Sequence, residues 1–265
     1  MHLQILAPAP QLQPYIKCYY VSESNYQRFV TDVFFADGCV EAVFHAGLDF
    51  YRGEVKECSA KVIGQIIQPL TMRALGRGKT FGIWFYPHTF SLFCGIPLHE
   101  INDRILSLDN LFNTDFIDTV FNYLANNDTA VLAQHINKGL LKKLRYSPMG
   151  VKEEVIAYAV TQLQLQRNCN IGQLAQHCGV TQRYLQKIFN LRVGYSPAMF
   201  AKVIRFQRAL RGLVEQTQCS LTRISGDAGY YDQAHFIRDF RQFTGVTPTQ
   251  FRLSIHPINQ YFINL

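Results

Sequence analysis

The chain has 265 residues, of which 48% are hydrophobic, and it carries a formal net charge of +7. This length allows one or two domains with packed cores. The sequence has no run of eighteen apolar residues, and its beginning, MHLQILAPAPQL, has no basic segment followed by a long apolar stretch. We therefore expect neither a membrane-spanning helix nor a signal peptide, and no membrane partner.

The cysteines are scattered along the chain and are odd in number: Cys18, Cys39, Cys58, Cys94, Cys169, Cys178 and Cys219. They form no C-x-x-C pair and no cysteine–histidine spacing of the kind found in zinc sites. Scattered thiols are typical of a reducing compartment. We therefore expect a cytoplasmic protein with reduced cysteines.

Residues 1–105 are predicted to be rich in β-structure. Runs of β-branched and aromatic residues predict strands at Tyr15–Val21, Val30–Phe35, Cys39–His45, Lys61–Ile67 and Thr80–Tyr86. Turn signals between them are Asp37-Gly38, Gly47, Arg52-Gly53 and Gly76–Gly78. Many short strands at such spacing are typical of a sandwich or a small barrel.

One group of polar residues in this region has the types that bind metal in cupin barrels: Glu41, His45, His88 and His99. The spacing argues against a metal site, because no H-x-H precedes the glutamate. The region also lacks G-x-G-x-x-G, P-loop, G-x-S-x-G and H-E-x-x-H motifs. We therefore expect no enzyme, no metal and no cofactor.

Several aromatic residues of the same region have two interpretations. Most are expected to be ordinary core residues. Some could instead line a cavity for a small-molecule effector, and the residues proposed for it are Phe34, Phe44, His45, Trp84 and Tyr86.

After Leu108 the pattern becomes helical. Asp115 is the expected N-cap of a helix whose apolar side carries Phe116, Ile117, Val120, Phe121 and Leu124. A second helix follows Asp128 and carries Leu132, Ile136, Leu140, Leu141 and Leu144. These apolar faces either pack on the β-domain or form the interface of a homodimer. The turn-rich segment Tyr146–Gly150 is the expected linker, which divides the chain into domains 1–146 and 151–265.

The second domain is predicted to be entirely helical. A helix over about 151–167 is followed by NIGQLAQHCGVTQRYLQKIFNLRVGYSP, Asn170–Pro197. This stretch predicts one helix that ends near Gly179 and a second that is capped by Thr181 and ends near Gly194. Ser196-Pro197 then opens the next helix. A tight junction between two short helices is typical of a helix-turn-helix motif.

The same pattern recurs about fifty residues later in SLTRISGDAGYYDQAHFIRDFRQFTGVTPTQF, Ser220–Phe251. Ser220 caps the first helix, Gly229 ends it, and Asp232 caps the second, which ends at Gly245. A long helix over Pro197–Glu215 joins the two motifs. At 1.5 Å per residue it is roughly 28 Å long, which is close to the ~34 Å of one turn of B-DNA.

These residues resemble the DNA-binding domain of the AraC/XylS family of transcriptional regulators. The matching positions are Leu174-Ala175, Val180-Thr181, Arg183–Leu185, Phe189, Gly194, Ser196-Pro197, Arg205, Ala209-Leu210, Ile224, Ala228–Tyr230, Asp232-Gln233, His235-Phe236, Phe240, Gly245, Thr247-Pro248 and Phe251-Arg252. Ser225 departs from the alanine usual in the family. The resemblance implies seven helices with two helix-turn-helix motifs that read adjacent segments of the major groove.

The first half is similar to the N-terminal β-domain of one branch of that family, a domain that is itself largely uncharacterised. The matching positions are Ala7-Pro8, Leu12, Tyr15-Ile16, Tyr19-Tyr20, Phe35–Phe44, Ile63–Gln65, Gly82–Pro87, Gly95–Pro97 and Asp103. This resemblance implies a sensing or regulatory role without naming an effector. In some relatives a helical dimerisation element follows.

The excess of positive over negative charge is confined to the second half. Residues 151–265 hold thirteen basic and six acidic residues, and residues 1–150 hold thirteen of each. Such a distribution is expected of a domain that neutralises DNA phosphates. We expect base contacts from Gln182, Arg183, Gln186, Gln233, His235 and Arg238, and backbone contacts from Lys187, Arg192 and Arg241. The predicted fold class is α+β. From the duplicated motif and this charge distribution, the chain is predicted to be a sequence-specific regulator of transcription that binds double-stranded DNA.

Its further expected partners are a small-molecule effector, a second copy of the chain and, if it activates transcription, RNA polymerase. Two rival classes remain. A metal-dependent cupin enzyme fused to DNA-binding helices would contain bound metal, and a relative of the alkyl-transfer repair regulators would need a four-cysteine cluster that Cys18, Cys39 and Cys58 are too far apart to resemble. An interaction protein with a basic face would bind DNA without discriminating between sequences.

Overall fold

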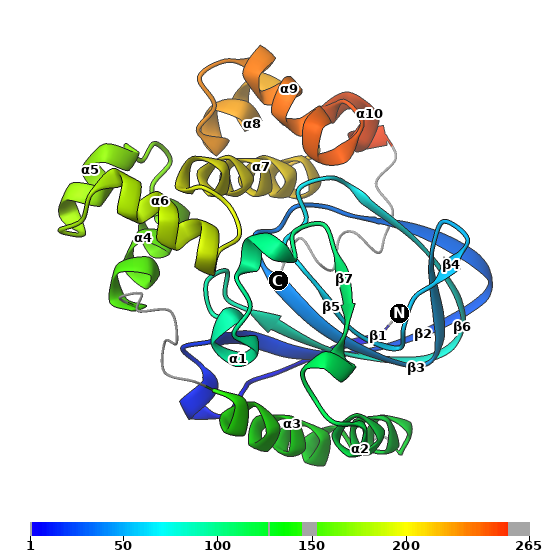
Figure 1. The fold of residues 1–265 in the computed structure, drawn as a ribbon. Helices are drawn as coiled ribbons and strands as arrows, with labels where there is room; N and C mark the ends of the chain where they lie inside the picture. The colour runs from blue at the N-terminus through cyan, green and yellow to red at the C-terminus, as the bar shows by residue number, and fades with distance from the viewer. Residues whose placement is uncertain (1, 127, 145–152, 254–265) are drawn as a thin grey trace.

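The computed structural model describes residues 2–126, 128–144 and 153–253 (Figure 1). It consists of a curved β-sheet with two helices below it and a group of helices above it in this view. The α+β class, with a β-rich N-terminal domain and an all-α C-terminal domain, is confirmed. The expected linker Tyr146–Gly150 lies outside the described residues, as does the start of the first helix of the second domain.

The described strands form one antiparallel sheet. They are β1 (His2–Leu6), β2 (Ile16–Phe34), β3 (Val40–Arg52), β4 (Val55–Lys56), β5 (Ala60–Ile63), β6 (Leu70–Phe85) and β7 (Ile105–Ser107). Their order is β1-β2-β6-β3-β5-β7, with β4 paired to β3. Long, strongly curved strands give the sheet a barrel-like shape (Figure 1).

Two of the predicted turns lie inside strands. The pairing of β3 with β6 shifts register between Ala46 and Leu48, where Gly47 has φ +76°, and Gly76 opposite has φ +107°. A Cβ atom on Gly78 would lie 1.8 Å from the carbonyl oxygen of Ala46. These glycines therefore serve a β-bulge and a close approach of two backbones, and they do not reverse the chain. The expected turn at Gly53, with φ +61°, does connect β3 to β4.

One face of the sheet is covered by α2 (Thr114–Ala125) and α3 (Thr129–Lys143) (Figure 1). Phe44 and Phe81 from the sheet pack there with Val120 and Ile136 from the helices. The predicted apolar faces are thus used for packing on the β-domain. Leu141 is an exception, because it is 39% exposed.

The N-cap of α2 differs from the prediction. Asn113 accepts a hydrogen bond from the backbone N–H of Phe116 at 3.2 Å, so Asn113 caps the helix and Asp115 lies in its first turn. Short helical segments complete this domain: η1 (Pro10–Leu12), α1 (Ser91–Cys94), η2 (Leu98–Glu100) and η3 (Leu108–Asn110).

The helical domain contains α4 (Glu153–Leu165), α5 (Ile171–His177), α6 (Gln182–Arg192), α7 (Pro197–Glu215), α8 (Leu221–Ala228), α9 (Gln233–Thr244) and α10 (Pro248–Leu253). The side chains of Thr181, Ser196, Ser220 and Asp232 cap their helices as expected. Ser225, the departure from the family pattern, is buried, and its hydroxyl donates to the Thr222 carbonyl at 2.9 Å. A hydroxyl is therefore tolerated at this core position.

The other face of the sheet meets the helical domain. Ala36, in the loop after β2, belongs to the same apolar cluster as the core of the helices, and its carbonyl accepts a hydrogen bond from the Gln207 amide on α7. The Tyr195 hydroxyl donates to the carbonyl of Ile66 at 3.0 Å, and the Asn102 amide donates to that of Gly194 at 2.6 Å. The long helix α7 is therefore in direct contact with the β-domain.

Candidate nucleic-acid interface

The first helix-turn-helix motif consists of α5 and α6. Gly179 between them has φ +65°, a left-handed conformation that favours glycine, and Thr181 then caps α6 by accepting from the N–H of Tyr184 at 3.2 Å. Leu185, Ile188 and Phe189 face the core. The opposite side of α6 presents four predicted contact residues, all exposed: Gln182, Arg183, Gln186 and Lys187. The last three border a shallow hollow on the surface.

The second motif consists of α8 and α9. Gly229 ends α8 with φ +94°, and a Cβ atom there would lie 3.0 Å from the carbonyl oxygen of Arg167. Asp232 accepts from the N–H of His235 at 2.6 Å and so fixes the start of α9. The exposed side of α9 presents Gln233, Arg238 and Arg241.

His235 is less exposed than the other predicted contact residues of α9. Its Nε2 lies 3.4 Å from Oδ2 of Asp239, one helical turn further on, and the ring meets Tyr230 edge-on. The His235 side chain keeps 38% of its surface exposed. The imidazole therefore lies next to a buried carboxylate while part of its edge stays accessible.

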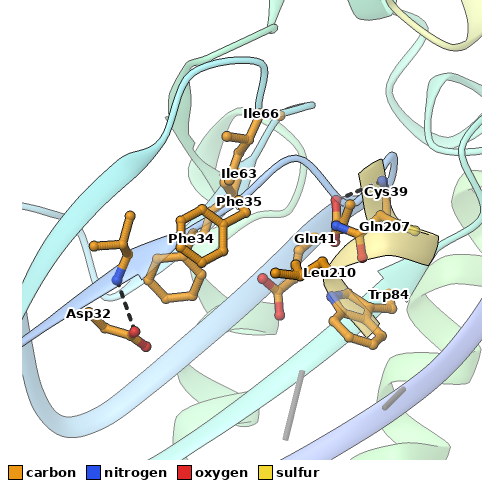
Figure 2. Close-up of a pocket in the computed structure, with 13 residues that line it drawn as sticks. Asp32, Phe34, Phe35, Cys39, Glu41, Ile63, Ile66, Trp84, Gln207 and Leu210 are labelled. Carbon is orange, nitrogen blue, oxygen red and sulfur yellow. Dashed lines mark hydrogen bonds between the residues drawn. The ribbon is translucent and has the colours of Figure 1, made fainter. Parts of the chain in front are cut away.

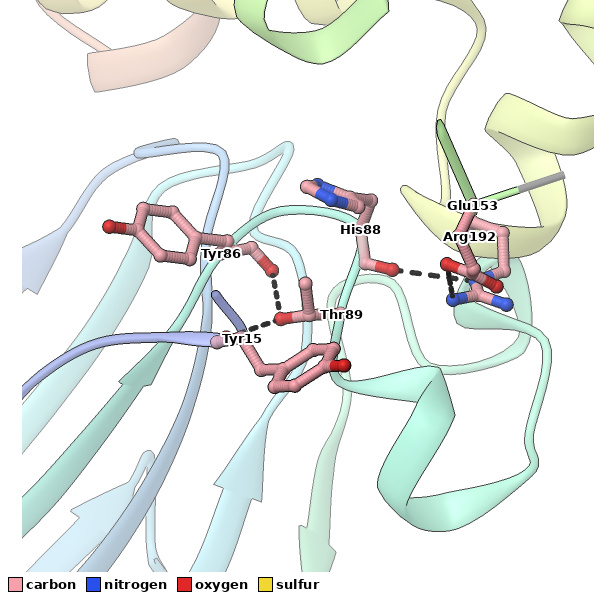
Figure 3. A network of polar contacts seen from close by, with 6 residues as sticks. All are labelled: Tyr15, Tyr86, His88, Thr89, Glu153 and Arg192. Atoms are coloured by element: carbon pink, nitrogen blue, oxygen red, sulfur yellow. Dashed lines mark hydrogen bonds and ion pairs between the residues drawn. The ribbon is translucent and has the colours of Figure 1, made fainter. Parts of the chain in front are cut away.

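Arg192 does not belong to the exposed set. Its side chain is 1% exposed, its guanidinium pairs with the Glu153 carboxylate of α4 at 2.7 Å, and its Nε donates to the carbonyl of His88 at 3.4 Å (Figure 3). The expected contact of Arg192 with the DNA backbone is therefore wrong for this conformation. An arginine in the last turn of an amphipathic helix looks solvent-facing in the sequence, and its burial here depends on contacts with α4 and with the β-domain.

The basic residues of α7 are mostly engaged within the protein. Lys202 pairs with Asp239 of α9 at 3.0 Å, and the Arg205 guanidinium lies 5.7 Å from the centre of the Tyr230 ring. Arg208 donates to the backbone carbonyls of Gln164, in the last turn of α4, and of Gln166, just after that helix. These contacts hold α7 against α4 on one side and against the second motif on the other. We therefore expect α7 to keep the two motifs at a fixed distance and orientation.

The exposed sides of α6 and α9 are electropositive. The segment Gln182–Arg192 contains no acidic residue, and the single carboxylate of Gln233–Thr244, that of Asp239, is buried. Arg183, Lys187, Arg238 and Arg241 therefore face solvent without an exposed acidic neighbour on their own helix. Exposed Arg, Lys and Gln side chains on a helix suit phosphates and the base edges of the major groove.

The β-domain contains two adjoining cavities of about 70 Å³ each on the sheet face toward α7. They share Asp32, Phe34, Glu41 and Ile63. Of the residues predicted for an effector cavity, Phe34 borders both, Trp84 borders the first and His45 the second.

Two of the predicted effector residues lie elsewhere. Side chains alternate along β3, so Phe44 points to the opposite face and packs against Phe81 and Phe121. Tyr86, which follows the end of β6, is not among the residues that line either cavity. Four lining residues with acidic or basic side chains, Asp32, Asp37, Glu41 and Lys61, were not predicted for an effector cavity.

The histidines considered for metal are also separated. His88 lies beside Arg192 at the domain contact (Figure 3), where burial lowers its pKa to about 4, and His99 Nδ1 lies 3.2 Å from the carbonyl oxygen of Asn190. Among the described residues, no group of three or more His, Cys, Asp or Glu side chains is placed to hold a metal ion. In the same part of the chain, no helix has the length and apolar character needed to cross a membrane.

Comparison with known proteins separates the two halves. A family model described as a helix-turn-helix domain matches residues 174–254, and one described as a domain of unknown function, DUF6597, matches residues 4–107. An uncharacterised HTH-type transcriptional regulator of Haemophilus influenzae is 26% identical over 166 residues, which are 61% of this chain and 54% of that protein. ArgR, an HTH-type transcriptional regulator of Pseudomonas aeruginosa, is 29% identical over 96 residues, 36% of this chain and 29% of ArgR. The chain thus spans about half or less of these relatives.

Two solved structures are also similar to this chain. A transcriptional regulator with an AraC-type DNA-binding domain from Chromobacterium violaceum is 25% identical, over 38% of this chain and 91% of that one, with a TM-score of 0.35. ToxT from Vibrio cholerae aligns with 89% of this chain and 97% of its own at 10% identity and a TM-score of 0.49.

Proposed function

We propose that this chain binds double-stranded DNA sequence-specifically with both helix-turn-helix motifs. It belongs to the AraC-type helix-turn-helix transcriptional regulators and carries an N-terminal DUF6597 domain. The observation that carries the proposal is the pair of exposed, acid-free faces of α6 and α9, joined by one pinned helix. At roughly 28 Å, α7 can place the two recognition helices close to one DNA turn apart.

The exposed residues divide into two roles in this proposal. Base readout falls to Gln182, Arg183 and Gln186 on α6 and to Gln233, His235 and Arg238 on α9, because glutamine pairs with adenine and arginine with guanine. Lys187 and Arg241 contact phosphates. Arg192 is left out, since its guanidinium is occupied by Glu153.

The test is selection of bound sequences. The full chain would be incubated with fragmented genomic DNA, and the retained fragments sequenced. We expect enrichment of one DNA sequence that contains two separate conserved segments. The logarithm of the affinity for that sequence should fall linearly with the logarithm of the salt concentration. Equal retention of all fragments would instead support the rival proposal of an interaction protein with an unspecific basic face.

The proposal gives the N-terminal domain the sensing role. Gln207 and Leu210 of α7 help to line the first cavity of the β-domain. A small molecule in that cavity would touch the helix that holds both motifs, so its binding would be coupled to the spacing or orientation of α6 and α9. The experiment is to measure affinity for the selected DNA with and without a ligand found to bind the chain, and a ligand without any effect would contradict the coupling.

Such a regulator acts in the cytoplasm and, if it activates transcription, meets RNA polymerase there. A homodimer, if formed, would use surfaces other than the apolar faces of α2 and α3, because these cover the sheet. The oligomeric state can be measured by light scattering with and without DNA.

A further inference from the structure

Lys61 is a buried ammonium group at the second cavity. The residue is 1% exposed, and its Nζ has no hydrogen-bond partner; it lies 4.8 Å from the centre of the Phe50 ring. Burial lowers the pKa of Lys61 to about 8, so the group remains protonated at neutral pH. A buried charge without a counterion is costly. This position therefore favours a ligand that supplies negative charge.

The groups around Lys61 leave that charge uncompensated. Of the neighbours whose charge acts on the lysine, Glu57 is paired with Arg52 at 2.9 Å, Cys58 is a thiol, and Glu41 lies beyond ion-pair distance. Among the described residues, no carboxylate oxygen lies within 4.0 Å of the Lys61 ammonium. An anion entering the cavity would therefore not have to displace a protein carboxylate.

His45 adds a second buried and unpartnered polar atom to the same cavity. Its Nδ1 lies 2.8 Å from the Thr80 hydroxyl, and its Nε2 has no partner although the residue is 7% exposed. Burial holds the pKa of His45 well below its usual range, so the ring is neutral and can donate one hydrogen bond. The buried hydroxyls of Ser22 and Ser24 line this cavity too. One end of the site is therefore built for a carboxylate.

An acidic group, the carboxyl group of Glu41, lies where the two cavities meet. Pairing places Val43 opposite Lys61 and Glu41 opposite Ile63, so the side chains of Glu41 and Lys61 lie on one face of the sheet. Glu41 accepts a hydrogen bond from the Tyr20 hydroxyl, and Figure 2 shows its carboxylate between Phe34 and Trp84. A carboxylate flanked by aromatic rings suits an ammonium group.

We infer that the two cavities together bind a small zwitterion of the amino-acid class, with its carboxylate on Lys61 and His45 and its ammonium on Glu41. The ligand is the effector of the regulatory function proposed above, on which this inference rests. Each cavity of about 70 Å³ has the volume of about two waters. The site therefore has room for the two charged groups and a short side chain.

The test is calorimetric titration of the full chain with each of the twenty common amino acids, without DNA. For the tightest binder, the acid that lacks its amino group and the amine that lacks its carboxyl group are titrated next. We expect each truncated compound to bind at least tenfold more weakly. Failure of all twenty to bind at millimolar concentration would overturn the inference, and so would a truncated compound that binds as tightly as the zwitterion.

Two variants test which residue binds the carboxylate of the ligand and which binds its ammonium group. Lys61→Met should abolish the advantage of the zwitterion over its amine analogue, and Glu41→Gln should abolish its advantage over the deaminated acid. Lys56→Met is the matched control, because Lys56 is exposed and paired with Asp49 outside the cavities. If a variant does not fold, the comparison of the three compounds on the natural chain still decides. Binding of the zwitterion by a chain that fails to select DNA would count against the regulatory function alone.

Discussion

Lys202 of α7 and Asp239 of α9 form an ion pair at 3.0 Å, which links the connecting helix to the second recognition helix. Asp239 is 2% exposed, and its second carboxylate oxygen lies 3.4 Å from His235 Nε2. A single buried carboxylate thus links the connecting helix to α9 and also lies next to a proposed base-reading side chain. The Lys202 ammonium also donates a hydrogen bond to the Gln242 side-chain oxygen at 2.6 Å.

Lys202→Met should therefore act on stability and geometry. It leaves Asp239 buried without its cation, and we expect the free energy of unfolding to fall by about 2 kcal/mol. Chemical denaturation measures this change. Lys187→Met is the matched control: Lys187 is exposed on α6, so its loss should leave stability within about 0.5 kcal/mol and reduce the salt dependence of DNA binding by about one unit. Equal stability losses would show that the Lys202 pair has no structural role.

The two exposed arginines of α9 are predicted to differ. Arg238→Ala should cost about 1–3 kcal/mol of binding free energy and relax the preference at one base pair, whereas Arg241→Ala should weaken binding to all sequences alike. Affinities for a set of single-base variants of the selected site distinguish the two patterns. A uniform loss for Arg238→Ala would make it a phosphate contact. The same comparison with Gln182→Ala and Gln233→Ala tests whether the glutamines read bases.

Stability should depend on pH through Glu41. Burial raises the pKa of this carboxyl group from 4.5 to about 7, with Asp37 adding to the rise and Tyr20 and Lys61 opposing it. The folded protein therefore holds this proton to higher pH than the unfolded chain does, so the stabilisation is complete below about pH 4.5 and is lost as pH rises through about 7.

Glu41→Gln removes the titration and retains an oxygen that can accept from Tyr20. Relative to the variant, the natural chain should lose up to about 3 kcal/mol of unfolding free energy between pH 5 and pH 7.5. Asp37, whose pKa burial raises to about 6, titrates in both proteins and largely cancels in the difference. If the unfolding free energies of the two proteins change with pH in parallel over this range, the pKa of Glu41 is not raised by folding.

The helical domain could be predicted closely because its signals are local. The bounds Pro197–Glu215 follow from a serine cap, a proline in the first turn and an uninterrupted apolar face, and the structure has the same bounds. The turns of the β-domain could be predicted less accurately, because a glycine that reverses the chain and a glycine that permits a bulge look alike in sequence. Gly47 and Gly76 were of the second kind.

The residues whose place the sequence did not reveal depend on contacts between distant segments. Arg192 is buried by Glu153 and by the loop at His88, 39 and 104 residues away. Lys61 lies in the short strand Ala60–Ile63, all of whose residues are buried, so no alternation of polar and apolar residues marks its orientation. Only the pairing of β5 with β3 places it on the same face of the sheet as Glu41.

The last prediction concerns the spacing of the two motifs on DNA. Because α7 is held to α9 by Lys202 and to the end of α4 by Arg208, one chain should protect two major-groove segments about 10 bp apart. The motifs present different residues, so the site should be asymmetric within one chain. Inserting about five base pairs between the segments rotates one by half a turn. A pinned helix cannot follow that rotation, so either the DNA twists or one motif loses its contacts.

Affinity for the insertion site should then fall toward that of a single motif, by tenfold or more if the lost motif makes one bidentate base contact. Inserting about ten base pairs is the control for length, because it restores the face of the DNA but exceeds the reach of α7; it should bind as weakly as the five-base-pair insertion if one chain spans both segments. Recovery of affinity with ten base pairs would mean that the segments are bound by two chains. Unchanged affinity with five would mean that one motif alone reads DNA, and a fluorescence anisotropy titration of the three sites distinguishes these outcomes.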